Sequence, residues 1–363
     1  MVSSLSHIQF GNQTQRRAEQ RRFWLLLATL VGLLFISITL AVVIGPVPIP
    51  AGQVWRIALS EVISGIAGDW TQAQYNIVWL IRLPRVLLAM FVGAGLAVVG
   101  VTMQAMVRNL LADPYLLGIS SGASVGAVMV LALGAFAFAG VYAISFGAFI
   151  GSLLTFVIVF ILAQSHGQLG PTRLVLSGLA VSYFFSGLTS FITLTSPERE
   201  LARSVLAWLL GSLAGAEWVD LGLPAAVLAL GMLYLASQAR ALNALIVGEE
   251  TAATLGVDTT RFRRQLFLIV SLLTGTMVAV SGAIGFVGLM MPHLVRLMVG
   301  ADHRRVLPVS VFVGSIFLIW VDVVARTAFA PVELPVGVIT SLLGGPFFLW
   351  LLRGQLKNKG GQR

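Results

Sequence analysis

The segment from Gln265 to Val295 constrains the fold more than any other part of the chain, because its 31 residues include no Asp, Glu, Lys or Arg. A single helix of that length would be about 46 Å long at 1.5 Å per residue, whereas the hydrocarbon core of a bilayer is about 30 Å thick. Glycines between Gly282 and Gly288, followed by Pro292, interrupt the segment. We therefore expect the chain to turn at the glycines and to form one full membrane span and one short one.

Apolar runs of similar character recur along the whole chain. Hydrophobic residues make up 58% of the 363 residues and charged residues only 10%, compared with about 25% charged residues in soluble domains. Each run is close to the roughly 20 residues that a membrane helix needs. The composition therefore predicts an all-α membrane protein, with further helices at 23–44, 86–107, 115–138, 140–163, 174–195, 221–238, 306–328 and 335–352.

The net charge of +9 follows the predicted topology and does not indicate nucleic-acid binding. Cytoplasmic loops of membrane proteins accumulate Lys and Arg. With the N-terminus inside, ten crossings keep most of the 23 basic residues, including the Arg353–Arg363 tail, in the cytoplasm, whereas nine would export that tail. We therefore predict ten transmembrane helices with both termini cytoplasmic: a tail over 1–22, one membrane domain over 23–353 and a tail over 354–363.

The first apolar run and two of the loops have features of their own. The first run is longer than a signal-peptide core and no small-residue cleavage site follows it, so we expect a retained helix. The outer loop 45–78 contains an amphipathic stretch near 54–63. The apolar piece 205–213 is too short to span a bilayer, and we expect it to lie at the outer surface or to re-enter the membrane.

The largest inner loop, at about 239–264, is predicted to form two short helices. Gly248 and Gly256 mark the breaks between them. A compact, partly apolar helix pair suits insertion into a groove of another protein. The small apolar face of the loop consists of Ala252, Ala253 and Leu255.

Motifs for catalysis, metal binding and ATP hydrolysis do not form complete sets. Residues Gly118 to Gly122 match G-x-S-x-G, but a predicted helix start precedes them and apolar helix follows, so we interpret them as a helix-packing site. The chain has no cysteine, its four histidines form no i, i+4 pair, and no Gly-Lys pair supplies a phosphate-binding loop. We therefore expect no catalytic residue, metal or cofactor. Because a phosphate-binding loop for ATP is missing from the sequence, the energy for transport would come from an ion gradient or from another subunit.

An ion-coupled secondary transporter is the leading alternative from a different class. Such proteins usually bury carboxylates or histidines in the middle of the membrane. Asp322 is the only acidic residue within a predicted span, and Arg326 at i+4 predicts a local ion pair for it. The sequence therefore disfavours proton or sodium coupling.

Three arginines lie at the predicted outer face, where the positive-inside rule disfavours them. Arg82 and Arg85 open the second span, and Arg326 lies near the outer end of the ninth. One interpretation is that these side chains snorkel to the interface. The other is a basic docking surface for an acidic partner, since guanidinium groups pair carboxylates bidentately.

With these motifs in view, nearly the whole chain resembles the permease subunits of type II ATP-binding-cassette (ABC) importers for iron–siderophore complexes, haem and vitamin B12. The motifs follow one another in the family order and at the family spacing. They are Arg82-Leu-Pro-Arg85, Gly93 through Gly126, Gly248 through Gly256, Gly282 through Arg296, Asp302-His-Arg304, Asp322 through Arg326, Glu333 through Gly337 and Gly344 through Phe347.

The resemblance implies ten spans and a set of partners in a bacterial cytoplasmic (inner) membrane. These partners are a second permease subunit, with a homodimer favoured over a heterodimer, two cytoplasmic ABC ATPases and an extracytoplasmic substrate-binding protein. The implied cargo is an iron chelate, with a ferric siderophore first and haem or cobalamin as alternatives. ATP hydrolysis would reside on the partner subunits.

The resemblance also implies roles for particular residues. Arg82, Arg85 and Arg326 match positions that receive carboxylates of the binding protein. Asn109, Leu111 and Thr172 match positions that line a cytoplasmic gate, although Leu110 and Pro171 depart from the usual residues there. The positions that match the ATPase-coupling helices are Gly248, Glu249, Glu250, Thr251, Ala252, Leu255, Gly256 and Val257.

Overall fold

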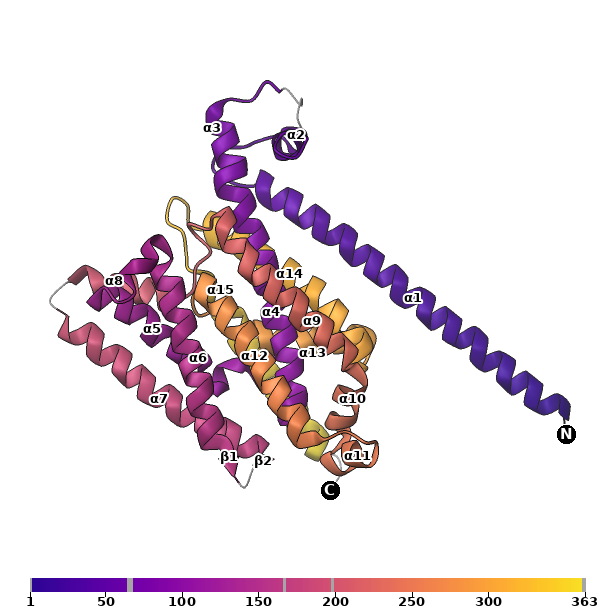
Figure 1. Ribbon diagram of the computed structural model, residues 1–363. Helices are drawn as coiled ribbons and strands as arrows, with labels where there is room; N and C mark the ends of the chain where they lie inside the picture. The colour runs from indigo at the N-terminus through magenta and orange to yellow at the C-terminus, as the bar shows by residue number, and fades with distance from the viewer. Residues whose placement is uncertain (1, 64–67, 166–167, 197–198, 361–363) are drawn as a thin grey trace.

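The structure is a computed structural model that describes residues 2–63, 68–165, 168–196 and 199–360, and within these ranges it is almost entirely helical (Figure 1). A ribbon of two short antiparallel strands, in which Gln164 pairs with Leu169, is the exception. The elements are α1 (Val2–Val43), α2 (Ala51–Ser60), α3 (Gln72–Tyr75), η1 (Asn76–Arg82), α4 (Leu83–Val107), η2 (Pro114–Leu117), α5 (Ile119–Leu133), η3 (Ala137–Tyr142), α6 (Ala143–Ala163), β1 (Gln164–Ser165), β2 (Gln168–Leu169), α7 (Pro171–Thr195), α8 (Arg199–Leu209), η4 (Trp218–Leu221), α9 (Gly222–Ser237), α10 (Ala239–Val247), α11 (Glu249–Thr254), α12 (Thr259–Ser281), α13 (Val287–Val299), α14 (His303–Thr327) and α15 (Val336–Gly360).

Among the described residues, eight helical stretches are long and apolar enough to cross a membrane, and α5 and α13 are shorter apolar helices. Together they make the ten membrane helices that the sequence predicts. The run 115–138 was expected to be a full span, but α5 has only 15 residues. Gly118 and Gly134, with φ of 73° and 64°, end the helix on either side because glycine adopts this left-handed region without a steric penalty.

The long uncharged segment turns at Gly282, as expected. Here α12 ends, residues 282–286 are not helical, and α13 begins at Val287. Gly282 has φ of 65°, and a Cβ at this position would clash with the carbonyl oxygen of Trp208. Both backbone conformation and packing therefore require glycine at the turn.

The predicted outer loop 45–78 is shorter in the structure, because helix already begins at Gln72 and continues through α3 and η1 into α4. The amphipathic stretch forms α2. η1 is a π-helical segment in which the N–H of Leu83 donates to the carbonyl of Val78. Pro84 follows directly; proline lacks an N–H and its ring clashes with the carbonyl at i−4, so a widened turn before it keeps the helix continuous.

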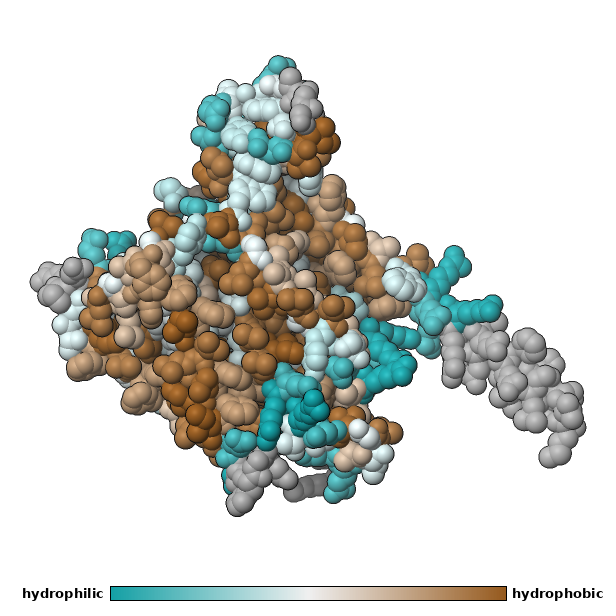
Figure 2. All heavy atoms as spheres, viewed as in Figure 1, coloured by the Kyte–Doolittle hydropathy of each residue, from teal (hydrophilic) through white to brown (hydrophobic). Residues whose placement is uncertain are grey.

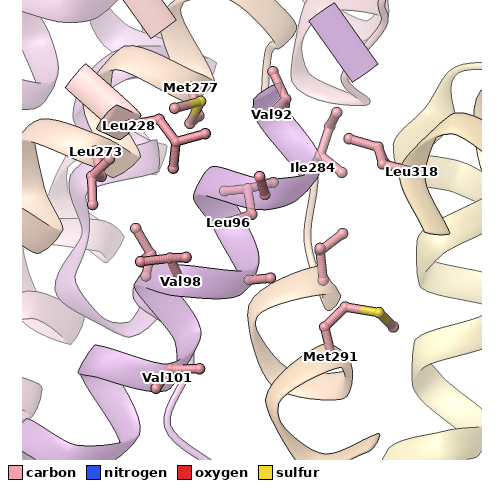
Figure 3. Packing of buried hydrophobic residues seen from close by; sticks show 14 of the residues in the cluster. Val92, Leu96, Val98, Val101, Leu228, Leu273, Met277, Ile284, Met291 and Leu318 are labelled. Atoms are coloured by element: carbon pink, nitrogen blue, oxygen red, sulfur yellow. The ribbon is translucent and has the colours of Figure 1, made fainter. Parts of the chain in front are cut away.

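α4 lies at the centre of the bundle. In Figure 3 its residues Val92, Leu96, Val98 and Val101 lie among side chains of α9, α12, α13 and α14. The most apolar part of the helical stretch that contains α4 is 83% buried. The corresponding parts of the stretches that contain α1, α7 and α9 are each only 22% buried. The outer helices therefore expose apolar side chains, as expected for helices that face lipid or another subunit.

Glycine contacts join the most closely packed helix pairs. α4 packs chiefly against α14, and α5 against α6. A Cβ on Gly93 would meet the carbonyl oxygen of Gly314, and one on Gly126 would meet that of Gly147. The backbones touch here without intervening side chains, which is how small residues promote helix association in lipid.

Many polar side chains lie toward the two ends of the molecule, and others lie on the outer part of α1 (Figure 2). α2 and α3 form one end, while β1, β2 and α11 lie at the other (Figure 1), and apolar side chains cover much of the surface between them (Figure 2). The first turns of α1 and the last turns of α15 point toward the α11 end. The predicted tails 1–22 and 354–363 are helical from Val2 and as far as Gly360, and residues 361–363 lie outside the described part.

Candidate functional site

Arg85 holds two carboxylates at the α2–α3 end of the bundle. Its Nε lies 2.9 Å from Asp322 Oδ1, and its Nη1 lies 2.8 Å from Glu333 Oε2. Asp322 is 1% exposed, while the Glu333 side chain is 48% exposed. Arg85 thus connects α4, α14 and the loop before α15 through one buried and one accessible ion pair.

Arg82 and Arg326 bind the C-terminal end of α1. Arg82 donates hydrogen bonds to the carbonyls of Val42 (2.9 Å) and Val47 (2.8 Å). Arg326 donates to the carbonyls of Ile44 (2.9 Å) and Ala41. The last carbonyls of a helix lack partners within the helix and carry partial negative charge. The two guanidinium groups therefore cap α1.

Neither sequence-based interpretation of these arginines describes their contacts. Arg82, Arg85 and Arg326 are 6–8% exposed, so they neither snorkel nor form an exposed basic surface. The physical reason is that carbonyls of α1 and two carboxylates satisfy them within the chain. The expected i, i+4 pair of Asp322 with Arg326 is present at 3.5 Å, but Arg85 is the closer partner of Asp322. A role of the three arginines in docking stays a prediction.

The inner loop forms two short helices, as predicted, and Gly248 separates α10 from α11. Gly256 has φ of 83° and follows the pair. The predicted apolar face is partly wrong: Ala252 is fully buried, because it points back into the protein. Leu255 is exposed as predicted, at 68%, and Val247, which was not part of the predicted face, is 72% exposed.

Asn243 fixes α10 to the start of α14. Its Oδ1 accepts a hydrogen bond from the backbone N–H of His303 (2.9 Å) and lies 2.6 Å from His303 Nδ1. Its Nδ2 donates to Asp302 Oδ1 at 2.7 Å. Partial burial acts to raise the pKa of Asp302, but the hydrogen bond from Asn243 and the nearby Arg304 and Arg305 lower it overall. Asp302 is therefore ionised when it accepts from Asn243 at neutral pH.

Arg263 fixes α11 to α12. Its guanidinium lies 3.3 Å from Glu249 Oε1 and donates to the carbonyl of Leu169 at 2.8 Å. Hydrogen bonding to Arg263 is the main cause that lowers the pKa of Glu249. The bond to Leu169 also connects α12 to the β1–β2 ribbon.

A cavity of about 590 Å³ lies beside α10. Two of the predicted gate residues, Asn109 and Thr172, both line this cavity. They are 63 residues apart in the sequence. Leu111 does not line it; its N–H donates to Asn109 Oδ1 (2.9 Å) and so holds that side chain. The remaining lining residues are Val107, Arg108, Pro171, Val175, Leu176 and Ile246.

Ile246 makes α10 part of this cavity wall, two residues before Gly248. Sequence reasoning missed Ile246, as well as the contacts of Asn243, Arg263 and Glu333. Motif spacing gives no signal for these side-chain contacts, because their partners are between 14 and 248 residues away.

A second cavity, of about 570 Å³, lies among α5, α6, α8 and α12. Trp208 of α8 and the segment 212–217 line it, with Glu217 and Asp220 as its acidic residues. α8 corresponds to the short apolar piece expected near 205–213, but it begins earlier, at Arg199, and ends at Leu209.

Comparison with known proteins identifies relatives of this architecture. The hemin transport system permease protein HmuU of Yersinia pestis is 44% identical over 288 residues, which cover 78% of this chain and 85% of the relative. The cobalamin import system permease protein BtuC of Halobacterium salinarum is 45% identical, covering 76% and 73%. The vitamin B12 import system permease protein BtuC of Salmonella paratyphi A is 38% identical, covering 94% and 98%.

A solved structure has the same fold. It is described as an inward-facing conformation of a metal-chelate type ABC transporter, and it matches with a TM-score of 0.78 at 31% identity, covering 91% of this chain and 99% of the solved chain. Residues 33–354 match the FecCD transport family. The extent of these matches, together with the ten apolar helices, shows that the chain is a membrane-spanning ABC importer permease of the FecCD transport family.

Proposed function

We propose that this chain forms the translocation pathway of an ABC importer for an iron chelate and that partner ATPases drive it through α10 and α11. The observation that carries the proposal is the position of Ile246. This residue lines the cavity with Asn109 and Thr172, while the neighbouring Val247 is 72% exposed. A partner that binds Val247 and Leu255 would therefore act directly on the cavity wall.

The partner surface can be tested by charge substitution. Leu255→Asp should reduce ATP-driven transport at least tenfold in proteoliposomes that contain the full importer, because a charged group cannot enter an apolar groove. Val62→Asp is a matched control: Val62 is 77% exposed and lies just after α2, at the opposite end. Normal transport by the Leu255→Asp protein would refute the coupling role.

The same pair of positions tests the predicted topology, in which both termini are cytoplasmic. The chain has no natural cysteine, so single cysteines can be labelled selectively. Val62→Cys should react with an impermeant maleimide from outside the cell, and Leu255→Cys only after permeabilisation. The reverse pattern would overturn the orientation.

The proposed cargo is a ferric siderophore. The names of the relatives favour hemin or cobalamin as the second candidate. Uptake of labelled ferric siderophore, hemin and cobalamin by proteoliposomes with the cognate binding protein shows which of the three is the cargo. Uptake driven by a proton or sodium gradient without ATP would instead support a secondary transporter.

We further propose that a substrate-binding protein docks over Arg82, Arg85 and Arg326, and that one of its carboxylates reaches the buried Arg85 by displacing Glu333. Glu333 occupies Nη1 of Arg85 and its side chain is about half exposed, so an incoming carboxylate would compete with it. Glu333→Gln should then tighten docking, and the gain should shrink at high salt as charges are screened. Unchanged docking affinity at low salt would count against this role.

A second copy of the chain is the proposed partner permease. α7 lines the 590 Å³ cavity and is largely exposed, with Tyr183 and Phe184 about 70% exposed. A second copy packed on α7 would close the cavity. Cross-linking of Tyr183→Cys between subunits of the assembled importer is expected, and its absence together with a monomeric mass would refute the dimer.

A further inference from the structure

A cavity of about 250 Å³ lies between the N-terminal part of α1 and the junction of α13 with α14. Its charged lining residues are Glu19, Arg22 and Arg305. Its apolar lining residues are Phe23, Leu26, Met298 and Val299. This cavity is separate from the two cavities described above and shares no lining residue with them.

The charges in this cavity favour an anion. Arg305 pairs with Glu19 at 3.4 Å, and its guanidinium carbon lies 6.0 Å from the centre of the Phe23 ring. Both members of the pair are exposed enough to exchange partners, at 35% and 53%. Among the described residues no ion pair is formed by Arg22, so the cavity keeps one positive charge in excess.

The cavity lies where polar residues give way to the apolar face of α1. Trp24 and Leu25 follow Arg22 and Phe23 along α1 and are 67% and 58% exposed. Tryptophan is enriched at the level of lipid headgroups. Met298, on the other wall, is 50% exposed. In Figure 2, hydrophilic residues of α1 lie beside apolar ones at this level. Positive charge and exposed apolar surface therefore lie side by side, which is the arrangement expected at the level of lipid headgroups.

We propose that this cavity binds one anionic phospholipid. The phosphate lies between Arg22 and Arg305, and the acyl chains follow Leu26 and Met298 into the bilayer. Basic pockets between membrane helices are suited to acidic headgroups. A soluble anion would use the arginines but not the exposed apolar walls, and a soluble protein partner would have to displace lipid from them.

The binding can be measured by native mass spectrometry of the full chain, titrated with phosphatidylglycerol or with phosphatidylcholine of the same acyl chains. We expect one phosphatidylglycerol to bind in preference to phosphatidylcholine. The Arg22→Gln and Arg305→Gln variants should each weaken phosphatidylglycerol binding about fivefold, the typical effect of one basic residue near an anionic membrane surface. Arg304→Gln is the control, because Arg304 is exposed beside Arg305 but does not line the cavity.

A variant that is expected to strengthen lipid binding distinguishes the loss of a binding residue from misfolding. Glu19→Gln removes the carboxylate that competes for Arg305, so it should strengthen phosphatidylglycerol binding although it breaks an ion pair. Equal binding of both lipids, or equal losses in the Arg304→Gln control, would overturn the proposal. Displacement of the bound lipid by millimolar inorganic phosphate would show a soluble-anion site and would overturn it as well.

Discussion

The two ends of α14 are held by different kinds of interaction. At one end Asp322 is buried and accepts from Arg85, with Arg326 nearby. At the other end the neutral side chain of Asn243 joins His303 and Asp302, and Asp302 is exposed to solvent. Breaking the buried Asp322 pair leaves charges without compensation, whereas loss of the Asn243 side chain leaves Asp302 to water and only the buried His303 without its partner. We therefore predict that the end of α14 at Asp322 is rigid and that the end held by Asn243 adjusts more easily.

The largest effect is expected for Asp322→Asn. This change leaves Arg85 and Arg326 without their buried carboxylate and should destabilise the protein by about 3–5 kcal/mol. Thermal unfolding of the purified protein in detergent measures it. Glu333→Gln is the control, because the other ion pair of Arg85 is accessible to water and should contribute at most about 1 kcal/mol. Equal losses in the two variants would contradict the assignment of a rigid end.

An intermediate effect is expected for Asn243→Ala. The variant removes the shared partner of His303 and Asp302, and its cost should be about 1–3 kcal/mol. Hydrogen exchange at α10 should accelerate while exchange at α4 stays unchanged. If α4 loses protection to the same degree, the Asn243 contact stabilises the whole bundle and not one end of it.

The smallest effect concerns the pH dependence of α11. The folded-state pKa of Glu249 is lowered below its ordinary value of 4.5, chiefly by hydrogen bonding to Arg263. Its ionised form therefore stabilises α11 fully above about pH 4.5, and this contribution is lost as the pH falls through the lowered pKa. Because Glu249 is 43% exposed, we expect less than about 1 kcal/mol.

Hydrogen exchange between pH 3 and 6 checks this prediction, with Glu249→Gln as the comparison. The variant should remove the acid-dependent part of the protection of α11 and leave the rest. An acid-induced loss of protection that persists in Glu249→Gln would assign the effect to another group.

The sequence predicted the membrane helices well because apolar length and glycine breaks are local properties. The turn at Gly282 and the division of the inner loop at Gly248 are both confirmed. Helix boundaries were less accurate: the sequence extended α5 too far and did not predict the helical turns before Arg82.

Side-chain partners could not be predicted in the same way. The charge rule identified Arg82, Arg85 and Arg326 as unusual but could not show that α1 carbonyls and Glu333 satisfy them, because those contacts depend on tertiary packing. Asn109 and Thr172 were paired by resemblance, and the structure places them in one cavity. Ile246, an ordinary apolar residue of a short helix, carried no sequence signal at all.

The glycine contacts between α4 and α14, and between α5 and α6, determine how this bundle can change shape. A contact of backbone against backbone has no rotamers, so it cannot adjust by small side-chain rearrangements. We therefore expect the two helices of each pair to move together in any change of conformation. Changes in backbone angle would then be expected at the non-helical junctions, such as those at Gly118 and Gly282, which have φ of 73° and 65°. A change in the shape of the bundle would then shift helix pairs relative to one another and leave the contact within each pair unchanged.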